Sequence, residues 1–172
     1  NFRKAKMRGA DLSDANLKGA DLRSADLTNA NLTGANLKNA KLNNVSAENS
    51  NFYGASLTKA VLSNGNFSNA GFYGADFTNA NLAGSNSPPP PPPFSNETPK
   101  TTTNLINANL WGSTLSGTNL TNVNLENANL YGSVASPSPA NFTGSLLYSA
   151  NRSSSIFDGA NFTEAFMHAS SI

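Results

Sequence analysis

The sequence predicts an all-β fold in which the chain winds as a parallel solenoid. Every fifth residue from position 2 to position 82 is apolar, seventeen centres in a row. The sites two residues before these centres, from 5 to 80, are alanine at thirteen of sixteen positions. A step of five scatters side chains around an α-helix and alternates faces along a strand. A continuous core therefore requires a corner once in every repeat, with one large and one small side chain pointing inward.

The inward pattern has few exceptions. Val45, Ser50 and Gly65 replace alanine at the small site, and Ala47 is the smallest centre. We expect Phe67, one coil later in the same column, to fill the space that Ala47 leaves. The other positions are mostly Asn, Asp, Ser, Thr, Lys and Gly, which face water or form the turns.

The residue types follow a fixed order within each repeat. Ala10-Asp11-Leu12, Ala30-Asn31-Leu32 and Ala80-Asn81-Leu82 each give a small residue, then Asn or Asp, then Leu. In this the chain resembles the pentapeptide-repeat family, over all but about 25 of its residues. The resemblance implies the family's fold, a right-handed quadrilateral parallel β-helix with four repeats per coil.

A recurring fingerprint supports four sides per coil. At a spacing of 20, Phe52-Tyr53-Gly54 recurs as Phe72-Tyr73-Gly74, and Leu110-Trp111-Gly112 recurs as Leu130-Tyr131-Gly132. Positions at this spacing stack directly if a coil has four walls of one repeat each. The chain then holds about 31 repeats, or about eight coils in one domain spanning 1–172.

Two segments interrupt the repeat. The spacing between the two fingerprint pairs is 38 rather than 20, which predicts an insertion of 18 at positions 86–103, including Pro88–Pro93 and Phe94. Proline has no N–H for a β-ladder, so this segment must loop out, and six prolines extend about 19 Å as polyproline II. The second segment, 136–139, shifts the frame by two. After it Arg152 falls on a core centre, and we expect the wall to bulge so that Arg152 reaches solvent.

This register predicts an aromatic ladder. If Leu110 and Leu130 continue the column of Phe52 and Phe72, then Tyr53, Tyr73, Trp111 and Tyr131 line one wall, backed by turn glycines. The ladder either stabilises the wall or forms a docking strip for another protein. The candidate partner-binding residues are those of the ladder and of the loop: Tyr53, Tyr73, Trp111, Tyr131, Pro88, Pro93 and Phe94.

Charge is small overall and uneven along the chain. The net charge is +1, with nine basic and five acidic residues in 1–60 and two basic and five acidic residues in 61–172. Stacking by 20 predicts two surface ion pairs, Lys6 with Asp26 and Asp21 with Lys41. Two like-charge columns are either an anion site or a solvated surface: Arg3 with Arg23, and Lys18 with Lys38.

The sequence offers little for catalysis. The single histidine, His168, follows a core centre and points outward, while the nearest acids, Asp158 and Glu164, fall on different walls. Asp11 and Asp14 share a wall without a third ligand. No Gly-rich phosphate loop is present. We expect no enzymatic activity, catalytic site, cofactor or metal.

The resemblance implies two binding roles. Some pentapeptide-repeat proteins mimic DNA and regulate a topoisomerase, but ten acids against eleven bases fall far short of the charge density of a duplex. The chain looks more like the family's cyanobacterial members of unknown function. We expect a scaffold that binds a protein partner through its side walls and Pro-rich loop, with a purely structural rod as the alternative. We expect no nucleic-acid partner.

Location and assembly stay open. The sequence has no apolar run long enough to span a bilayer, so we expect no membrane insertion. The chain begins at Asn1. The periplasm or thylakoid lumen is expected if an upstream signal peptide was removed, and the cytoplasm otherwise. The oligomeric state is not predicted.

Overall fold

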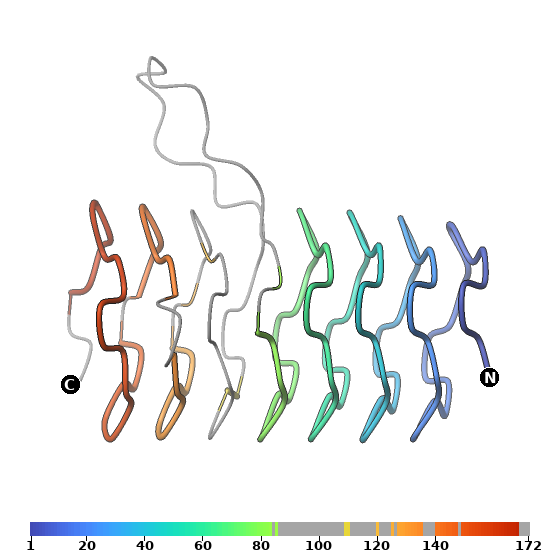
Figure 1. Ribbon diagram of the computed structural model, residues 1–172, viewed down its shortest axis with the longest axis horizontal. Coiled ribbons are helices and arrows are strands. Elements are labelled where there is room, and N and C mark those ends of the chain that lie inside the picture. The colour runs from blue at the N-terminus through green and yellow to red at the C-terminus, as the bar shows by residue number, and fades with distance from the viewer. Residues whose placement is uncertain are drawn as a thin grey trace, which may run out of the picture.

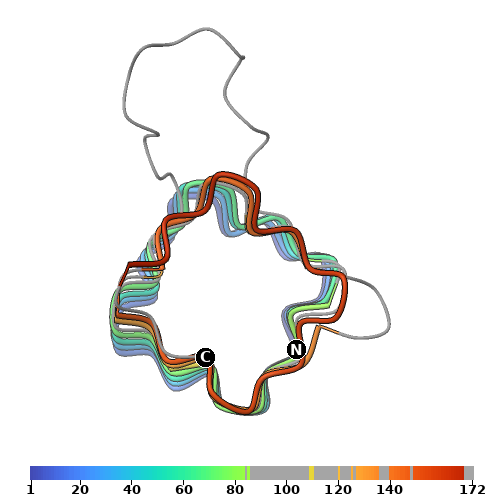
Figure 2. The same ribbon diagram turned by 90° about the vertical axis from the view of Figure 1, so that its left-hand side faces the viewer.

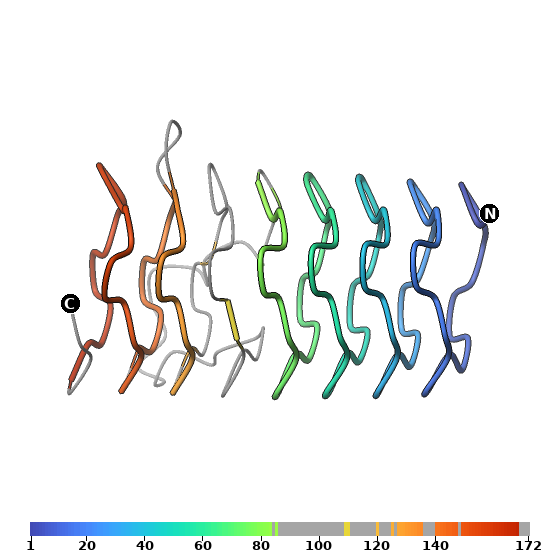
Figure 3. The same cartoon turned by 90° about the horizontal axis from the view of Figure 1, so that it is seen from below.

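The computed structural model describes residues 1–83, 85, 109–110, 120, 125, 127–135, 140–147 and 149–168. The chain winds into four-sided coils that superpose when viewed along the stacking axis (Figure 2). Side views from two directions show the coils stacked in one row, with the N-terminal coil at one end and the C-terminal coil at the other (Figures 1 and 3). The apolar side chains therefore share one continuous central core.

Neighbouring coils pair through single residues rather than through long strands. Over the described residues there is no helix, and each β-contact is an isolated parallel bridge made by the residue that precedes a centre. Throughout 6–81 the partners stand at a spacing of 20, as in Lys6 with Asp26 and Val61 with Asn81. In each pair the N–H of the next residue, a core centre, donates to the coil above, as Leu32 does to Asn51 at 2.6 Å.

Four walls follow from this pairing, and we name them by their core centres. They are wall A (Leu22, Leu42, Leu62, Leu82, Ala135, Phe157), wall B (Leu27, Ala47, Phe67, Leu120, Phe142, Phe162), wall C (Leu32, Phe52, Phe72, Leu125, Leu147, Met167) and wall D (Leu37, Leu57, Phe77, Leu110, Leu130, Arg152).

The corners are tight turns that explain the abundance of Asn and Gly. In every described turn the second residue after the centre has a positive φ, between 53° and 68°. The residue after it donates its N–H to the carbonyl of the centre, as Ala35 does to Leu32 at 3.0 Å. A positive φ at the third turn position is the requirement of a type II turn, which Gly and Asn meet at least cost.

The residue before each centre also supports the turn. Asn31 accepts hydrogen bonds at its Oδ1 from the backbone N–H and the hydroxyl of Thr33, at 3.2 and 2.7 Å. Asp26 does the same for Thr28. Asn or Asp two residues before Ser or Thr thus satisfies turn donors locally, which is why this position is rarely apolar.

The core follows the predicted inward pattern. Phe52 and Phe72 stack at 4.7 Å, and Phe67 meets both of them edge-on at 6.1 and 5.6 Å. The bridge between Ser46 and Asn66 places Phe67 directly over the buried Ala47, as expected. Gly65 is explained by the same ring, because a Cβ there would lie 2.4 Å from Cε2 of Phe67.

The register across the insertion differs from the prediction. Asp76 bridges Asn109, and Phe77 donates its N–H to Asn109 at 2.7 Å. Asp76 and Asn109 stand at a spacing of 33, against 20 in a regular coil, so the insertion adds thirteen to the coil rather than 18. Leu110 therefore continues wall D behind Phe77, and not wall C behind Phe72. Every wall takes an apolar centre and a small residue, so the inward pattern alone does not distinguish a register that is slipped by one repeat.

The second irregularity keeps its predicted offset, but Arg152 behaves differently. Asn129 with Asn151, and likewise Val134 with Ile156, stand at a spacing of 22, which is a shift of two. The expected bulge at Arg152 is wrong, because Leu130 still donates to Asn151 at 2.7 Å. Arg152 is instead half-buried, with its guanidinium 5.6 Å from the ring centre of Phe162, and burial lowers its pKa.

Candidate interaction surface

Tyr53 and Tyr73 form an exposed aromatic pair on wall C. Each follows a stacked core phenylalanine and points outward, with 43% and 47% of its surface exposed. Their ring centres are 6.0 Å apart and their planes are tilted by 53°. The inward stack of Phe52 and Phe72 therefore fixes the spacing of two exposed rings outside.

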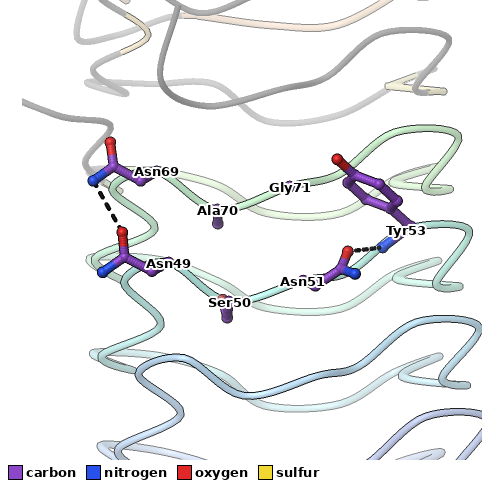
Figure 4. Close-up of a pocket in the computed structure, with 7 residues that line it drawn as sticks. All are labelled: Asn49, Ser50, Asn51, Tyr53, Asn69, Ala70 and Gly71. Carbon is purple, nitrogen blue, oxygen red and sulfur yellow. Dashed lines mark hydrogen bonds between the residues drawn. The ribbon is translucent and has the colours of Figure 1, made fainter. Parts of the chain in front are cut away.

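Gly71 lets the Tyr53 ring lie against the neighbouring coil. A Cβ at Gly71 would come within 2.4 Å of Cε1 of Tyr53, so any other residue here would displace the ring. Asn51 accepts a hydrogen bond from the N–H of Tyr53 at 3.0 Å, which holds the start of that turn. Figure 4 shows Tyr53 leaning toward the strand of Gly71.

A shallow depression lies beside this ring. Its volume is about 320 Å³, and it runs across two coils at the corner between walls B and C. Across it Asn69 donates from Nδ2 to Oδ1 of Asn49 at 3.1 Å (Figure 4). The residues that line it are uncharged: Asn49, Ser50, Asn51, Tyr53, Asn69, Ala70 and Gly71. We call the Tyr53–Tyr73 pair together with this depression the tyrosine strip.

The predicted four-membered ladder is wrong in one member. Leu130 donates its N–H to Asn151 and is therefore a centre of wall D. Tyr131, the next residue, thus lies on wall D and not beside Tyr73 on wall C. It is exposed, at 41%. Trp111, Pro88, Pro93 and Phe94 lie outside the described residues. Whether any of these residues contacts a partner stays a prediction.

Sequence reasoning missed the polar half of the strip. It named the tyrosines but not Asn49, Asn69 or Gly71. A signal was present, since Gly71 is the only glycine at the position before a centre in 1–82. A residue without a side chain at an outward-facing ladder position indicates that something else lies over the backbone.

A second organised surface is the polar ladder of wall D. Asn109 donates from Nδ2 to Asp76 at 3.3 Å and to Thr78 at 2.9 Å. In the next two coils, Asn129 donates to Asn109 at 3.1 Å, and Asn151 donates to Asn129 at 3.4 Å. The asparagines also accept bonds from their own turns, as Asn129 does from the N–H of Tyr131 at 3.1 Å. The ladder ties the coils on either side of the insertion together.

Asp76 is the acceptor at one end of this ladder. Burial raises its pKa, but hydrogen bonds from Thr78, Thr58 and Asn109 stabilise the carboxylate more strongly, so its pKa lies below the ordinary value. The shortest of these bonds comes from the hydroxyl of Thr78 at 2.6 Å.

The charged end coils pair differently from the prediction. In the described part of the chain, the ion pairs are Arg8 with Asp26 at 3.4 Å and Arg23 with Asp21 at 2.6 Å. Lys6 with Asp26 and Asp21 with Lys41 are therefore wrong as ion pairs. A carboxylate before a centre points along its own turn, where Arg23 binds both oxygens of Asp21. The side-chain hydrogen bond from Arg23 lowers the pKa of Asp21.

Few side chains that could form a metal or catalytic site lie together among the described residues. No three His, Cys, Asp or Glu side chains gather to hold a metal among the described residues. Asp158 and Glu164 lie on walls A and B, and His168 is exposed after Met167 on wall C, so these three are apart as predicted. Asp11 accepts hydrogen bonds from Ser13 and Asn31. The described segments include no helix of the length and hydropathy that a membrane span needs.

Comparison with solved structures shows the same fold elsewhere. A trypsin-treated variant of QnrB1, a plasmid-mediated fluoroquinolone resistance protein, is 16% identical with a TM-score of 0.72, over 96% of this chain and 84% of that one. A second such variant gives 19% and 0.64, over 99% and 75%. HetL, involved in heterocyst differentiation regulation in the cyanobacterium Nostoc sp. strain PCC 7120, gives 24% and 0.45, over 99% and 88%.

The sequence itself carries the family assignment. No curated protein matches the chain. The family model for pentapeptide repeats matches residues 1–34, 30–69, 50–86 and 103–134, with eight copies. The four-sided coil and the likeness to QnrB1 agree with this family's right-handed quadrilateral β-helix. The chain belongs to the pentapeptide-repeat family.

Proposed function

We propose that this chain is a non-enzymatic scaffold that binds another protein through its side walls, chiefly through the tyrosine strip, together with the Pro-rich loop predicted at 86–103. The observation that carries this proposal is the exposed pair Tyr53 and Tyr73 beside an uncharged depression. Tyrosine is enriched in interface hot spots because it supplies apolar area and a hydrogen-bonding tip with few rotatable bonds.

The surrounding surface supports the same choice. Elsewhere on the described walls, polar side chains largely bond to their own turn or to the next coil, as Thr33 does with Asn31 and Asn129 with Asn109. Such groups gain little from a partner, because they would exchange one hydrogen bond for another. The two rings, by contrast, leave apolar area in water that a partner would cover.

The charge distribution argues against the DNA-mimic alternative. Ten acids are spread over the whole chain and are outnumbered by eleven bases. Several acids that the structure describes are also engaged in their own turns, including Asp21, Asp26 and Asp76. A duplex mimic needs about one negative charge per 1.7 Å of axis. We therefore expect no inhibition of supercoiling by a topoisomerase at micromolar concentration.

The purely structural alternative makes a different prediction. Two tyrosines in contact stabilise each other by about 0.5–1.5 kcal/mol without any partner. In that case Tyr53→Ser and Tyr73→Ser lower the stability of the rod but remove no binding.

The test is capture of partners from the source cell by the tagged full chain. We expect a protein retained by the wild type to be lost with Tyr53→Ser/Tyr73→Ser and weakened when the six prolines Pro88–Pro93 are replaced by six Gly and Ser residues, which keeps the length of the chain. Tyr131→Ser, on wall D, is the matched control and should retain it. Capture that is unaffected by the wall C substitutions, at unchanged folding, would contradict the proposal, and salt-dependent inhibition of supercoiling would revive the DNA-mimic alternative.

A further inference from the structure

The tyrosine strip offers both donors and acceptors that the protein itself does not use. Among the described residues, no hydrogen bond involves the hydroxyl of Tyr53 or Tyr73, and none is donated by Nδ2 of Asn49 or Asn51. Oδ1 of Asn69 likewise accepts no hydrogen bond from a described residue. The strip therefore presents a mixed set of polar groups beside two exposed aromatic rings.

Gly71 leaves part of this polar set uncovered. The residues before the centres of wall C form a polar column, in which Asn31 donates from Nδ2 to Asp11 at 3.1 Å. Gly71 takes this position in the coil that follows Asn51, and the two residues form a parallel bridge. Because Gly71 has no side chain, the column is interrupted directly over Asn51. The depression lies at this interruption.

The two ends of the depression differ in polarity. The ring of Tyr53 lies at one end, and the amides of Asn49 and Asn69 lie at the other end, across wall C (Figure 4). The volume of about 320 Å³ is at the lower end of the range for small-molecule sites. A ligand that fits this space has an apolar face for the ring and a rim that both donates and accepts hydrogen bonds.

Neutral sugars have this chemistry. One face of a pyranose ring is a patch of C–H groups, whose small positive charge suits the negative face of an aromatic ring. Each hydroxyl on the rim both donates and accepts, so it can satisfy amide donors and amide acceptors alike. The residues that line the depression are uncharged, so a charged ligand finds no counter-ion among them.

We infer that the tyrosine strip binds a neutral oligosaccharide, as a stretch of a longer polysaccharide chain. The depression is shallow and runs across two coils, so it lies against the side of a chain and does not enclose a chain end. Tyr73 extends the aromatic surface, because its ring centre is 6.0 Å from that of Tyr53. The inference uses the same strip as the proposed function but does not require the protein partner.

The first experiment is an NMR titration of the ¹⁵N-labelled full chain with four neutral hexasaccharides: cellohexaose, maltohexaose, mannohexaose and chitohexaose. At millimolar concentration we expect at least one of them to give saturable shifts of the side-chain amide signals of Asn49, Asn51 and Asn69. The shifts should not depend on salt, because no charged group lines the site. The inference is overturned if none of the four gives a saturable shift, or if charged hexagalacturonate binds more tightly than all of them.

The second experiment repeats the titration with matched variants. Tyr53→Ala and Tyr73→Ala should each weaken binding about tenfold, and Tyr131→Ala, on wall D, should not. Asn69→Gly should weaken binding about fivefold and keeps its turn, because glycine accommodates the φ of 59° at that position. Asn79→Gly, at the same turn position on wall D with a φ of 55°, is the control. Equal binding by the wall C and wall D variants would overturn the inference.

The outcome is separable from the test of the proposed function. If no sugar binds while capture of a cell protein still depends on Tyr53, this inference is wrong and the proposed function stands. If a sugar binds the strip and no protein is captured, the proposed function is wrong and this inference stands. The unfolding midpoint of each variant, measured by circular dichroism, shows whether a loss of binding reflects a loss of folding.

Discussion

Asn109 donates from Nδ2 to Oδ1 of Asp76 at 3.3 Å, although the two stand at a spacing of 33 in the chain. Their backbones form a parallel bridge at the same point, and Asn109 donates its N–H to Ala75 at 3.0 Å. This contact joins the coils before and after the insertion, so Asp76 is where the continuity of wall D can be tested.

We expect Asp76→Ala to lower the free energy of unfolding by about 1–3 kcal/mol, because Thr58, Thr78 and Asn109 each lose an acceptor in a partly buried site. Urea unfolding followed by circular dichroism measures the change. Asp158→Ala, at an exposed site on wall A, is the control and should have almost no effect. Equal stability of the two variants would mean that the ladder does not support wall D.

Stability should also depend on pH through Asp76. Its pKa is lower in the folded protein than in the unfolded chain, where an aspartate has a pKa of about 3.9. The folded state therefore binds fewer protons, and the contribution of Asp76 is complete above that value and lost as the pH falls through its lower folded pKa. Wild type and Asp76→Asn should thus differ in stability most at pH 6–7 and converge toward pH 2. A difference that grows with acidity would contradict this sign.

Gly65→Ala should destabilise the core by about 1–3 kcal/mol, as overpacking does. The new Cβ would meet Cε2 and Cζ of Phe67 at 2.4 and 2.9 Å and the carbonyl of Leu62 at 3.0 Å. Phe67 is also confined by Phe52 and Phe72, so it cannot move aside freely. Thermal unfolding should show the loss, and the double variant Gly65→Ala/Phe67→Leu should recover part of it. An unchanged midpoint would mean that the ring has room to shift.

Gly71→Ala is the surface counterpart and should separate binding from folding. Its Cβ would come within 2.4 Å of Tyr53, but that ring is exposed and can rotate away, so stability should change by less than about 0.5 kcal/mol. The displaced ring should weaken partner capture. Binding at wild-type strength would show that the orientation of Tyr53 against the coil does not matter.

The five-residue repeat was enough to predict which residues face inward, because every wall imposes the same requirement. Leu32, Leu37 and Leu42 are fully buried, with Ala35 and Ala40 between them at the small sites. Asn and Gly after the centres adopt the positive φ of the turns for equally local reasons. The exposed pair Tyr53 and Tyr73 was also predictable, since an uninterrupted spacing of 20 places them in one column.

Only the tertiary structure decided which wall each repeat after the insertion joins. A slip of one repeat leaves an apolar centre and a small residue at every inward site, so the inward pattern at Leu110 fits wall C as well as wall D. The bridge of Asp76 with Asn109 selects wall D, and Tyr131 therefore lies apart from Tyr73. The sequence by itself determined the coil and its core, because these depend on local spacing. The pairing across the insertion, the ion pair of Asp26 with Arg8 and the site of Arg152 depend on contacts between coils or across the core that local spacing does not encode.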